Sequence, residues 1–213
     1  MLESNHLDSE SKCQPLHYLN TETIYPIMSI SDLDKLSRNL EPNSQGIPPL
    51  ELWHPDFCGD MDLRIARDGT WFHEGTPITR QAMVKMFSRI LWQEDGAYFL
   101  KTPVEKVGIQ VDDLPFLFVS LEVRDGPRGQ ELHFLSSTDD AIVAGQENPL
   151  VVTESEGNGE PQPALAVRFG MWGRLHRNVF YQLVELGTAE PCADGAEELV
   201  VYSSGERFSL GRL

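Results

Sequence analysis

The sequence is poor in positive charge. Its 213 residues include 17 lysines and arginines against 33 aspartates and glutamates, so the formal net charge is −16. A surface this acidic repels phosphate backbones and anionic lipid headgroups at long range, which argues against binding a nucleic-acid polymer or a membrane surface. A single small anion can still bind in a pocket, because near neighbours set the field inside a cleft.

Cysteine and long apolar runs are also scarce. The three cysteines, Cys13, Cys58 and Cys192, are far apart and form no CxxC pair or zinc-ligand spacing. This usage is typical of a reduced, cytoplasmic protein. No apolar run approaches the roughly 20 residues of a transmembrane helix. The N-terminal MLESNHLDSESK lacks the basic start and apolar core of a signal peptide. We therefore expect a cytoplasmic protein.

The familiar catalytic motifs are missing. The sequence has no GxSxG, no P-loop, no GxGxxG after a predicted strand and no HExxH. Catalytic residues and cofactors therefore stay unassigned, and a binding protein is favoured over an enzyme.

The first 27 residues are polar and show no apolar period, so we expect them to be poorly ordered. Apolar residues at helical spacing from Ile30 to Leu40 then predict a helix that starts near Met28. Whether residues 1–27 belong to the native protein is left open. We expect an N-terminal half over residues 28–125 and a C-terminal half over residues 126–213.

Hydrophobic periodicity predicts both strands and helices after this point. Alternating apolar residues flank a tight turn at Asp68-Gly69, and later segments show the apolar stripe of an amphipathic helix. The predicted elements are a β-hairpin over residues 61–78, a helix over 79–92, strands over 98–111 and 114–123, and a helix over 174–186.

The hairpin outline returns later in the chain. Leu132 and Phe134 match Leu63 and Ile65, and the segment 101–109 (KTPVEKVGI) matches 202–210 (YSSGERFSL) in the order of hydroxyl, acid, base and apolar residues. This self-similarity predicts an internal duplication of a hairpin–helix–strand unit. The expected fold class is α+β, with two related halves of curved antiparallel sheet and one helix packed on each.

Two long stretches also resemble a known family. ELWHPDFCGDMDLRIARDGTWFHEGTPITR, followed by YFLKTPVEKVGIQVDDLPF, is similar to the bacterial domain-of-unknown-function family 1285, from about Met28 to the C-terminus. The resemblance implies an internally duplicated core whose C-terminal half is superficially like a pleckstrin-homology barrel. It further implies a binding site between the halves for a nucleotide-like ligand, with a role in signalling. It supplies no catalytic residues.

Arginines near both predicted helix starts are the main binding candidates. A guanidinium beside a helix N-terminus suits a phosphate or carboxylate, and tryptophans can stack on a base. Salt bridges with the abundant acids explain the same arginines without a ligand. The candidate ligand-binding residues are Trp53, Arg64, Arg67, Trp71, Arg80, Arg174, His176 and Arg177.

A metal site is a weaker possibility. His54, Cys58, Asp60 and Asp62 supply nitrogen, sulfur and oxygen donors, but no second cluster backs them up. The leading hypothesis is thus a small-ligand-binding or signalling module with an anionic, nucleotide-like ligand between the halves. One alternative is a metal-dependent enzyme acting on a phosphorylated or nucleotide substrate. The other is an adaptor that offers a groove or a sheet edge to a protein partner.

Overall fold

The described part of the chain is mostly β-structure. The computed structural model describes residues 46–155, 157, 159–192 and 195–213, so the helix expected near Met28 and the polar residues 1–27 lie outside it. Fifteen strands in three sheets and two α-helices form within the described residues. Neither of these helices combines the length and the apolar character needed to cross a bilayer.

The first half is a six-stranded sheet with one helix. A short 3-10 helix (Leu50–Leu52) precedes it, and the sheet order is β3-β2-β1-β6-β5-β4. The elements are β1 (Phe57–Ile65), β2 (Trp71–His73), β3 (Thr76–Pro77), α2 (Gln81–Arg89), β4 (Leu91–Glu94), β5 (Ala97–Lys101) and β6 (Lys106–Val111).

The second half has a similar sheet and an added unit. Its sheet order is β10-β11-β12-β7-β8-β9, and the added unit is a helix followed by a three-stranded meander, β13-β14-β15. The sheet strands are β7 (Phe116–Gly126), β8 (Gly129–Ser136), β9 (Ala141–Val143), β10 (Leu150–Glu154), β11 (Pro161–Arg168) and β12 (Met171–Leu175). The added elements are α3 (Arg177–Leu186), β13 (Thr188–Pro191), β14 (Glu197–Ser203) and β15 (Glu206–Arg212).

The two six-stranded sheets share one topology. In each, the first and sixth strands lie side by side in parallel (β1 with β6, β7 with β12), and every other neighbouring pair is antiparallel. An internal duplication is therefore visible in the strand order. The expectation of wholly antiparallel sheets is wrong at these two central pairs. A pleckstrin-homology-like C-terminal half stays a prediction.

The residue matches proposed for the repeat are wrong in register. Leu63 lies on β1, but its match Leu132 lies on β8, whereas the topology equates β1 with β7. The helices are not equivalent either, because α2 follows the third strand of its sheet and α3 follows the sixth. Short hairpins share the same alternation and turn residues, so sequence similarity between two hairpins does not fix their place in a sheet.

The two predicted helices that fall within the described residues are shorter than expected. The first helix ends at Arg89. Ile90 follows it and Leu91 begins β4, and both side chains are buried. The second begins only at Arg177, because Arg174 and Leu175 belong to β12. Adjacent apolar residues fit a helix and a buried strand equally well, so periodicity alone did not mark these ends.

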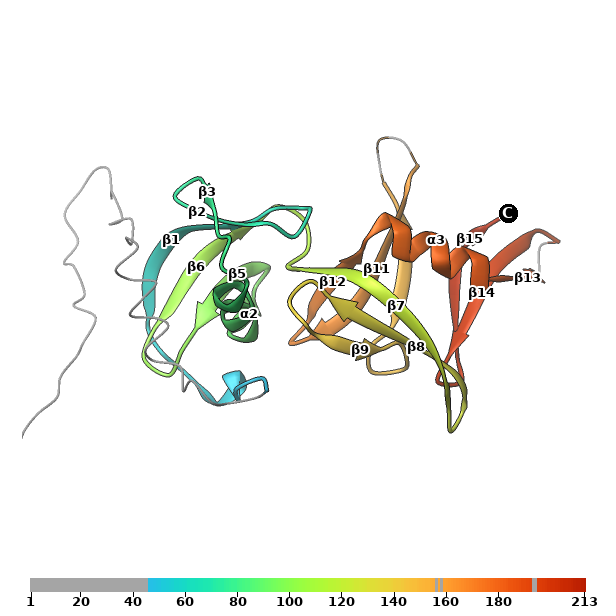
Figure 1. Ribbon diagram of the computed structural model, residues 1–213, viewed down its shortest axis with the longest axis horizontal. Helices are drawn as coiled ribbons and strands as arrows, with labels where there is room; N and C mark the ends of the chain where they lie inside the picture. The colour runs from blue at the N-terminus through green and yellow to red at the C-terminus, as the bar shows by residue number, and fades with distance from the viewer. Residues whose placement is uncertain (1–45, 156, 158, 193–194) are drawn as a thin grey trace, which may run out of the picture.

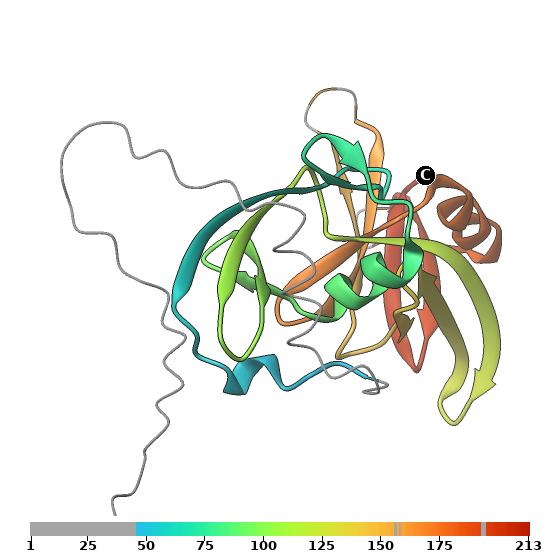
Figure 2. The same cartoon turned by 60° about the vertical axis from the view of Figure 1, so that its left-hand side comes forward.

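The halves pack directly against each other. Segment 112–115 joins the two sheets, and α2 lies on the side of the first half that faces the second (Figure 1). Figure 2 shows the long curve of β1 on the other side of this half. The rings of Trp92 and Phe169 meet across the junction with centroids 5.1 Å apart. Buried apolar residues of both halves belong to one continuous core. The junction is therefore a packed interface.

Gly173 should be intolerant of any side chain. It sits on β12 against β7, where an added Cβ would lie 2.5 Å from the Phe118 ring and 2.9 Å from the Phe116 Cβ. We expect Gly173→Ala to lower the free energy of unfolding by about 1–3 kcal/mol through overpacking. Chemical denaturation measures this, with Gly157→Ala, where a Cβ meets nothing within 4 Å, as the matched control. Equal stabilities of the two variants would contradict the packing described.

Candidate functional site

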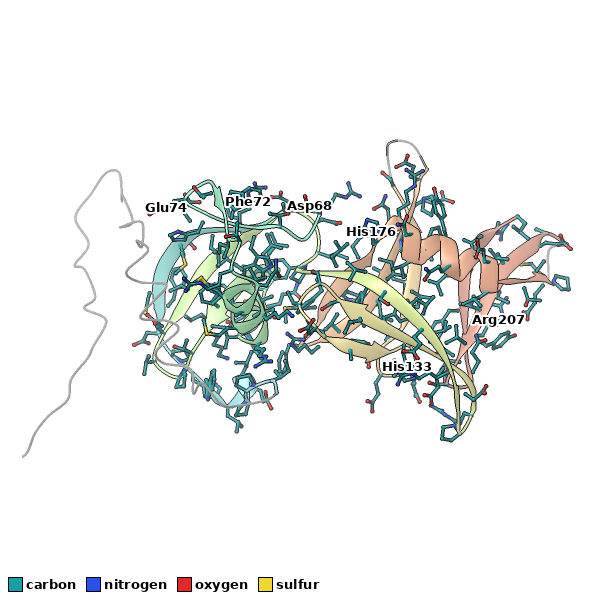
Figure 3. All side chains as sticks on the ribbon, viewed as in Figure 1. Asp68, Phe72, Glu74, His133, His176 and Arg207 are labelled. Carbon is teal, nitrogen blue, oxygen red and sulfur yellow. The ribbon has the colours of Figure 1, made fainter. Side chains whose placement is uncertain are left out.

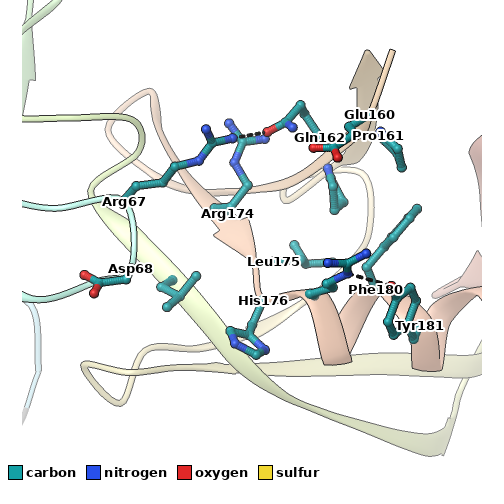
Figure 4. Close-up of a pocket in the computed structure, with 13 residues that line it drawn as sticks. Arg67, Asp68, Glu160, Pro161, Gln162, Arg174, Leu175, His176, Phe180 and Tyr181 are labelled. Carbon is teal, nitrogen blue, oxygen red and sulfur yellow. Dashed lines mark hydrogen bonds between the residues drawn. The ribbon is translucent and has the colours of Figure 1, made fainter. Parts of the chain in front are cut away.

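A groove of about 510 Å³ opens where the two halves meet. Asp68 on the first half and His176 on the second lie on facing sides of this junction (Figure 3). The groove is shown in Figure 4 and is called the junction groove below. Its lining residues are Arg67, Asp68, Leu117, Glu160, Pro161, Gln162, Pro163, Arg174, Leu175, His176, Arg177, Phe180 and Tyr181.

The turn after β1 brings the first half to the groove. Gly69 has φ +81°, and a Cβ on it would lie 3.2 Å from the Leu117 side chain, so the turn rests on β7 of the second half. This close approach places Arg67 over the mouth of the groove, where its Nη2 donates to Oε1 of Gln162 at 2.6 Å. The turn chemistry predicted at Asp68-Gly69 thus positions a groove residue.

Asp113 ties the two halves together through two arginines of the groove lining. Arg174 donates two hydrogen bonds to its carboxylate, at 2.9 and 2.7 Å, and Arg67 Nε lies 3.6 Å from Oδ2. The hydrogen bonds from Arg174 hold the pKa of the Asp113 carboxyl below its usual value; partial burial opposes this, and the charges of Arg174 and Arg67 reinforce it. Asp113 is therefore ionised at neutral pH.

Asp113 should make the free energy of unfolding fall at acidic pH. Because its folded pKa is depressed, it stabilises the fold above its unfolded pKa of about 3.9, and this contribution is lost as pH falls through the folded pKa. We expect Asp113→Asn to cost about 1–3 kcal/mol at pH 7 and to lose less stability than wild type on further acidification. Denaturation curves from pH 7 to 3 test this. Glu122→Gln removes an exposed partner of Arg124 and serves as the control. Parallel pH curves for wild type and Asp113→Asn would contradict the assignment.

The start of α3 supplies the opposite wall. The N–H of Asn178 donates to Nδ1 of His176, and the N–H groups of Val179 and Phe180 donate to its carbonyl. His176 therefore caps the helix and uses the first-turn N–H groups that an anion would need. Nε of Arg177, the first residue of α3, donates to the hydroxyl of Tyr181, one helical turn later, at 2.6 Å. The guanidinium of Arg177 and the Tyr181 hydroxyl are then the polar groups that this wall offers.

The structure brings four of the eight candidate residues together. Arg67, Arg174, His176 and Arg177 all line the junction groove. They come from a turn, a strand and a helix start, and the parallel contact of β12 with β7 places the last three beside the segment that follows β6.

The other four candidates do not line this groove. Arg64 is bound to Asp112 at 2.5 Å and covers the Phe72 ring, and the Arg80 carbonyl accepts the first bonds of α2. Trp71 is 2% exposed and stacks on Phe87 inside the core, so it cannot stack on a ligand from outside. Trp53 packs partly buried against the same core.

The weak metal candidates do not converge. Among residues 46–155, 157, 159–192 and 195–213, no group of three or more histidine, cysteine, aspartate or glutamate side chains could hold a metal ion. Asp60 and Asp62 are exposed on β1, and Oδ1 of Asp60 lies over the backbone of Gly108. Cys58 Sγ contacts the Asp56 carbonyl at 3.5 Å. His54, Cys58, Asp60 and Asp62 thus offer no assembled ligand set.

Several groove residues were not predicted from the sequence. Tyr181 was detectable, because it lies four residues after Arg177 and so falls on the same helix face. Phe180 was detectable on the same ground, because it lies three residues after Arg177. Asp113 and Gln162 were not, because only the packing of β11, β12 and the segment after β6 brings them to the groove arginines.

Comparisons with known proteins agree on one family. The family model of the N-terminal domain of DUF1285, a domain of unknown function, matches residues 48–114, and that of the C-terminal domain matches residues 115–210. A crystal structure of a DUF1285 family protein from Silicibacter pomeroyi DSS-3 is 44% identical, with a TM-score of 0.77 over 85% of this chain and 95% of that one. Another, from Shewanella baltica OS155, is 30% identical, with a TM-score of 0.46 over 58% of this chain and 91% of that one. No curated protein matches the chain.

Proposed function

We propose that this chain, which belongs to the DUF1285 family, is a binding module that holds a small anionic ligand in the junction groove. A signalling role, which the family resemblance implies, and a cytoplasmic setting, which the cysteine usage suggests, are part of the proposal. The family description assigns no activity, and the support for a ligand comes from the groove itself.

One observation carries the proposal: guanidinium groups from both halves meet in one groove. Arg67 comes from the first half, and Arg174 and Arg177 come from the second. The groove volume of about 510 Å³ lies within the 300–1,000 Å³ range of small-molecule sites. The groove lining carries three arginines against two acids, Asp68 and Glu160, which is a local exception in a chain with a net charge of −16 and favours an anion.

The position of the groove supports a role for the ligand in joining the halves. A ligand that touches both Arg67 and Arg177 adds a contact between the halves, and it stabilises the folded chain by mass action. Such a ligand can change how a partner protein meets the junction surface, which is the link to signalling.

A ligand panel tests the proposal. The full chain is screened by thermal shift against nucleotides, cyclic nucleotides, phosphosugars, organic acids and divalent metals. A ligand at 100 times its dissociation constant adds about 2.7 kcal/mol to stability, which shifts the midpoint by several degrees. We expect an anion to give this shift and Arg177→Ala to reduce it.

Arg124→Ala is the matched control, because Arg124 is exposed on β7 and does not line the groove. An equal reduction in both arginine variants would remove the groove from the explanation. A shift from metals alone would favour the metal-dependent alternative, and silence from the whole panel would favour the protein adaptor.

A further inference from the structure

We infer that the ligand of the junction groove is a monoanion with an apolar body, such as an aryl or alkyl carboxylate, and that it is not a nucleotide or another polyanion. This inference rests on the proposed function and narrows its ligand class. It follows from how the groove charges are already used and from the chemistry of the walls.

Two of the three arginines are already engaged by a carboxylate. Arg174 holds Asp113 with two hydrogen bonds, and Arg67 lies 3.6 Å from the same carboxylate while donating to Gln162. Arg177 differs, since it donates to the neutral Tyr181 hydroxyl and forms no ion pair within the described part of the chain. One guanidinium is therefore left for a ligand charge.

The charge balance around the groove also limits the ligand. Its three arginines are matched in number by Asp68 and Glu160 on its lining and by Asp113, which pairs with Arg174 and Arg67. The Asp68 carboxylate points away from His176 and Tyr181 in Figure 4, so it does not occupy the α3 wall to which Arg177 belongs. A second negative charge on the ligand would find no unpaired arginine in the groove, and the acidic chain, with a net charge of −16, would repel it.

Arg177 and Tyr181 together fit a carboxylate. A guanidinium has five N–H donors in a planar fork, and Nε is the one used on Tyr181. The Nη groups can then bind a carboxylate through two bonds, which is the strong geometry for this pair. Because the Tyr181 oxygen accepts a bond from Arg177, its own O–H is available as a further donor.

Part of the groove lining is apolar. Leu117, Pro161, Pro163 and Phe180 line the groove together with its polar side chains and give the body of a ligand an apolar surface. Proline has no backbone N–H, and the other two side chains cannot form hydrogen bonds. Ribose hydroxyls or base edges buried here would lose water without gaining a partner, whereas an aryl or alkyl body would gain from burial.

Calorimetric titration of the full chain tests this class directly. The probes are 4-phenylbutyrate and octanoate, their neutral amides, acetate, and the nucleotides AMP and ATP. We expect 4-phenylbutyrate or octanoate to bind at least about tenfold more tightly than acetate, their own amides or either nucleotide, a difference of about 1.4 kcal/mol. Arg177→Gln should remove the advantage of the acids over the amides, and Arg124→Gln should leave it unchanged.

The other outcomes overturn the inference in distinguishable ways. Tight binding of AMP or ATP that depends on Arg177, with weak binding of the apolar acids, would reject the ligand class and leave the proposed function intact. Equal binding of acids and amides would reject the need for a charge. If no anion bound in an Arg177-dependent way, both the inference and the proposed function would be wrong.

Discussion

Replacing Arg168 with alanine is expected to lower the free energy of unfolding by about 3–5 kcal/mol, the largest stability effect we predict for this protein. Arg168 Nη1 binds Asp140 at 2.5 Å, its Nη2 donates to the Ser88 carbonyl of α2 at 2.7 Å, and its guanidinium covers the Phe116 ring. The two ionised side chains are only 13% and 8% exposed. Removing the arginine leaves Asp140 buried without its counter-charge and cuts a bond between the halves.

Chemical denaturation with a double-mutant cycle measures this effect. Ser136 and Thr138 also donate to Asp140, so the carboxylate keeps some hydrogen bonds in Arg168→Ala but no cation. We expect Arg168→Ala and Asp140→Ala to couple by about 0.5–3 kcal/mol. Arg124→Ala, which breaks an exposed pair, should fall within about 0.5 kcal/mol of wild type. A similarly small loss of stability in Arg168→Ala would contradict the importance of the buried Arg168–Asp140 ion pair.

The sequence predicted the fold where its signals are local. The hairpin around Asp68-Gly69 is confirmed because alternation and turn residues are encoded within a few neighbouring positions. The parallel contacts of β1 with β6 and of β7 with β12 were missed because their paired residues are 46 to 57 positions apart in sequence, and no local pattern specifies such a pair. The duplication was inferred from hairpin similarity, yet the shared feature is the order of six strands.

The candidate site was also predicted only where its signals are local. Arg174, His176 and Arg177 were proposed from a helix start and meet Arg67 at the groove. Arg64 and Arg80 looked equivalent in sequence, but Arg64 is held by Asp112. Which arginine faces the junction depends on which neighbouring aspartate binds it, and adjacent Asp112 and Asp113 bind different arginines. That choice is made by tertiary packing, so the sequence could not supply it.

Arg177→Ala should have the largest effect on ligand binding. Loss of a charge-assisted hydrogen bond to the anion is expected to weaken binding by about 10- to 100-fold, which corresponds to roughly 1.5–3 kcal/mol. Arg177 is exposed, and Tyr181 is its one side-chain partner among the residues that the structure describes, so the fold should keep its stability. Arg177→Lys keeps the charge but loses the fork, and an intermediate affinity is expected. Calorimetry on the best anion of the panel checks this, with Arg124→Ala as the control. Unchanged affinity in Arg177→Ala would exclude Arg177 from the site.

A crystal structure of the full chain with the tightest-binding anion would show whether that anion binds in the junction groove at Arg177. We expect the anionic oxygens to lie about 2.7–2.9 Å from the Arg177 Nη atoms. We also expect the Tyr181 hydroxyl to be a further donor and the apolar body of the ligand to pack against Leu117 and Phe180. An anion bound at the same affinity but elsewhere on the molecule, with the junction groove filled only by water, would contradict binding at Arg177.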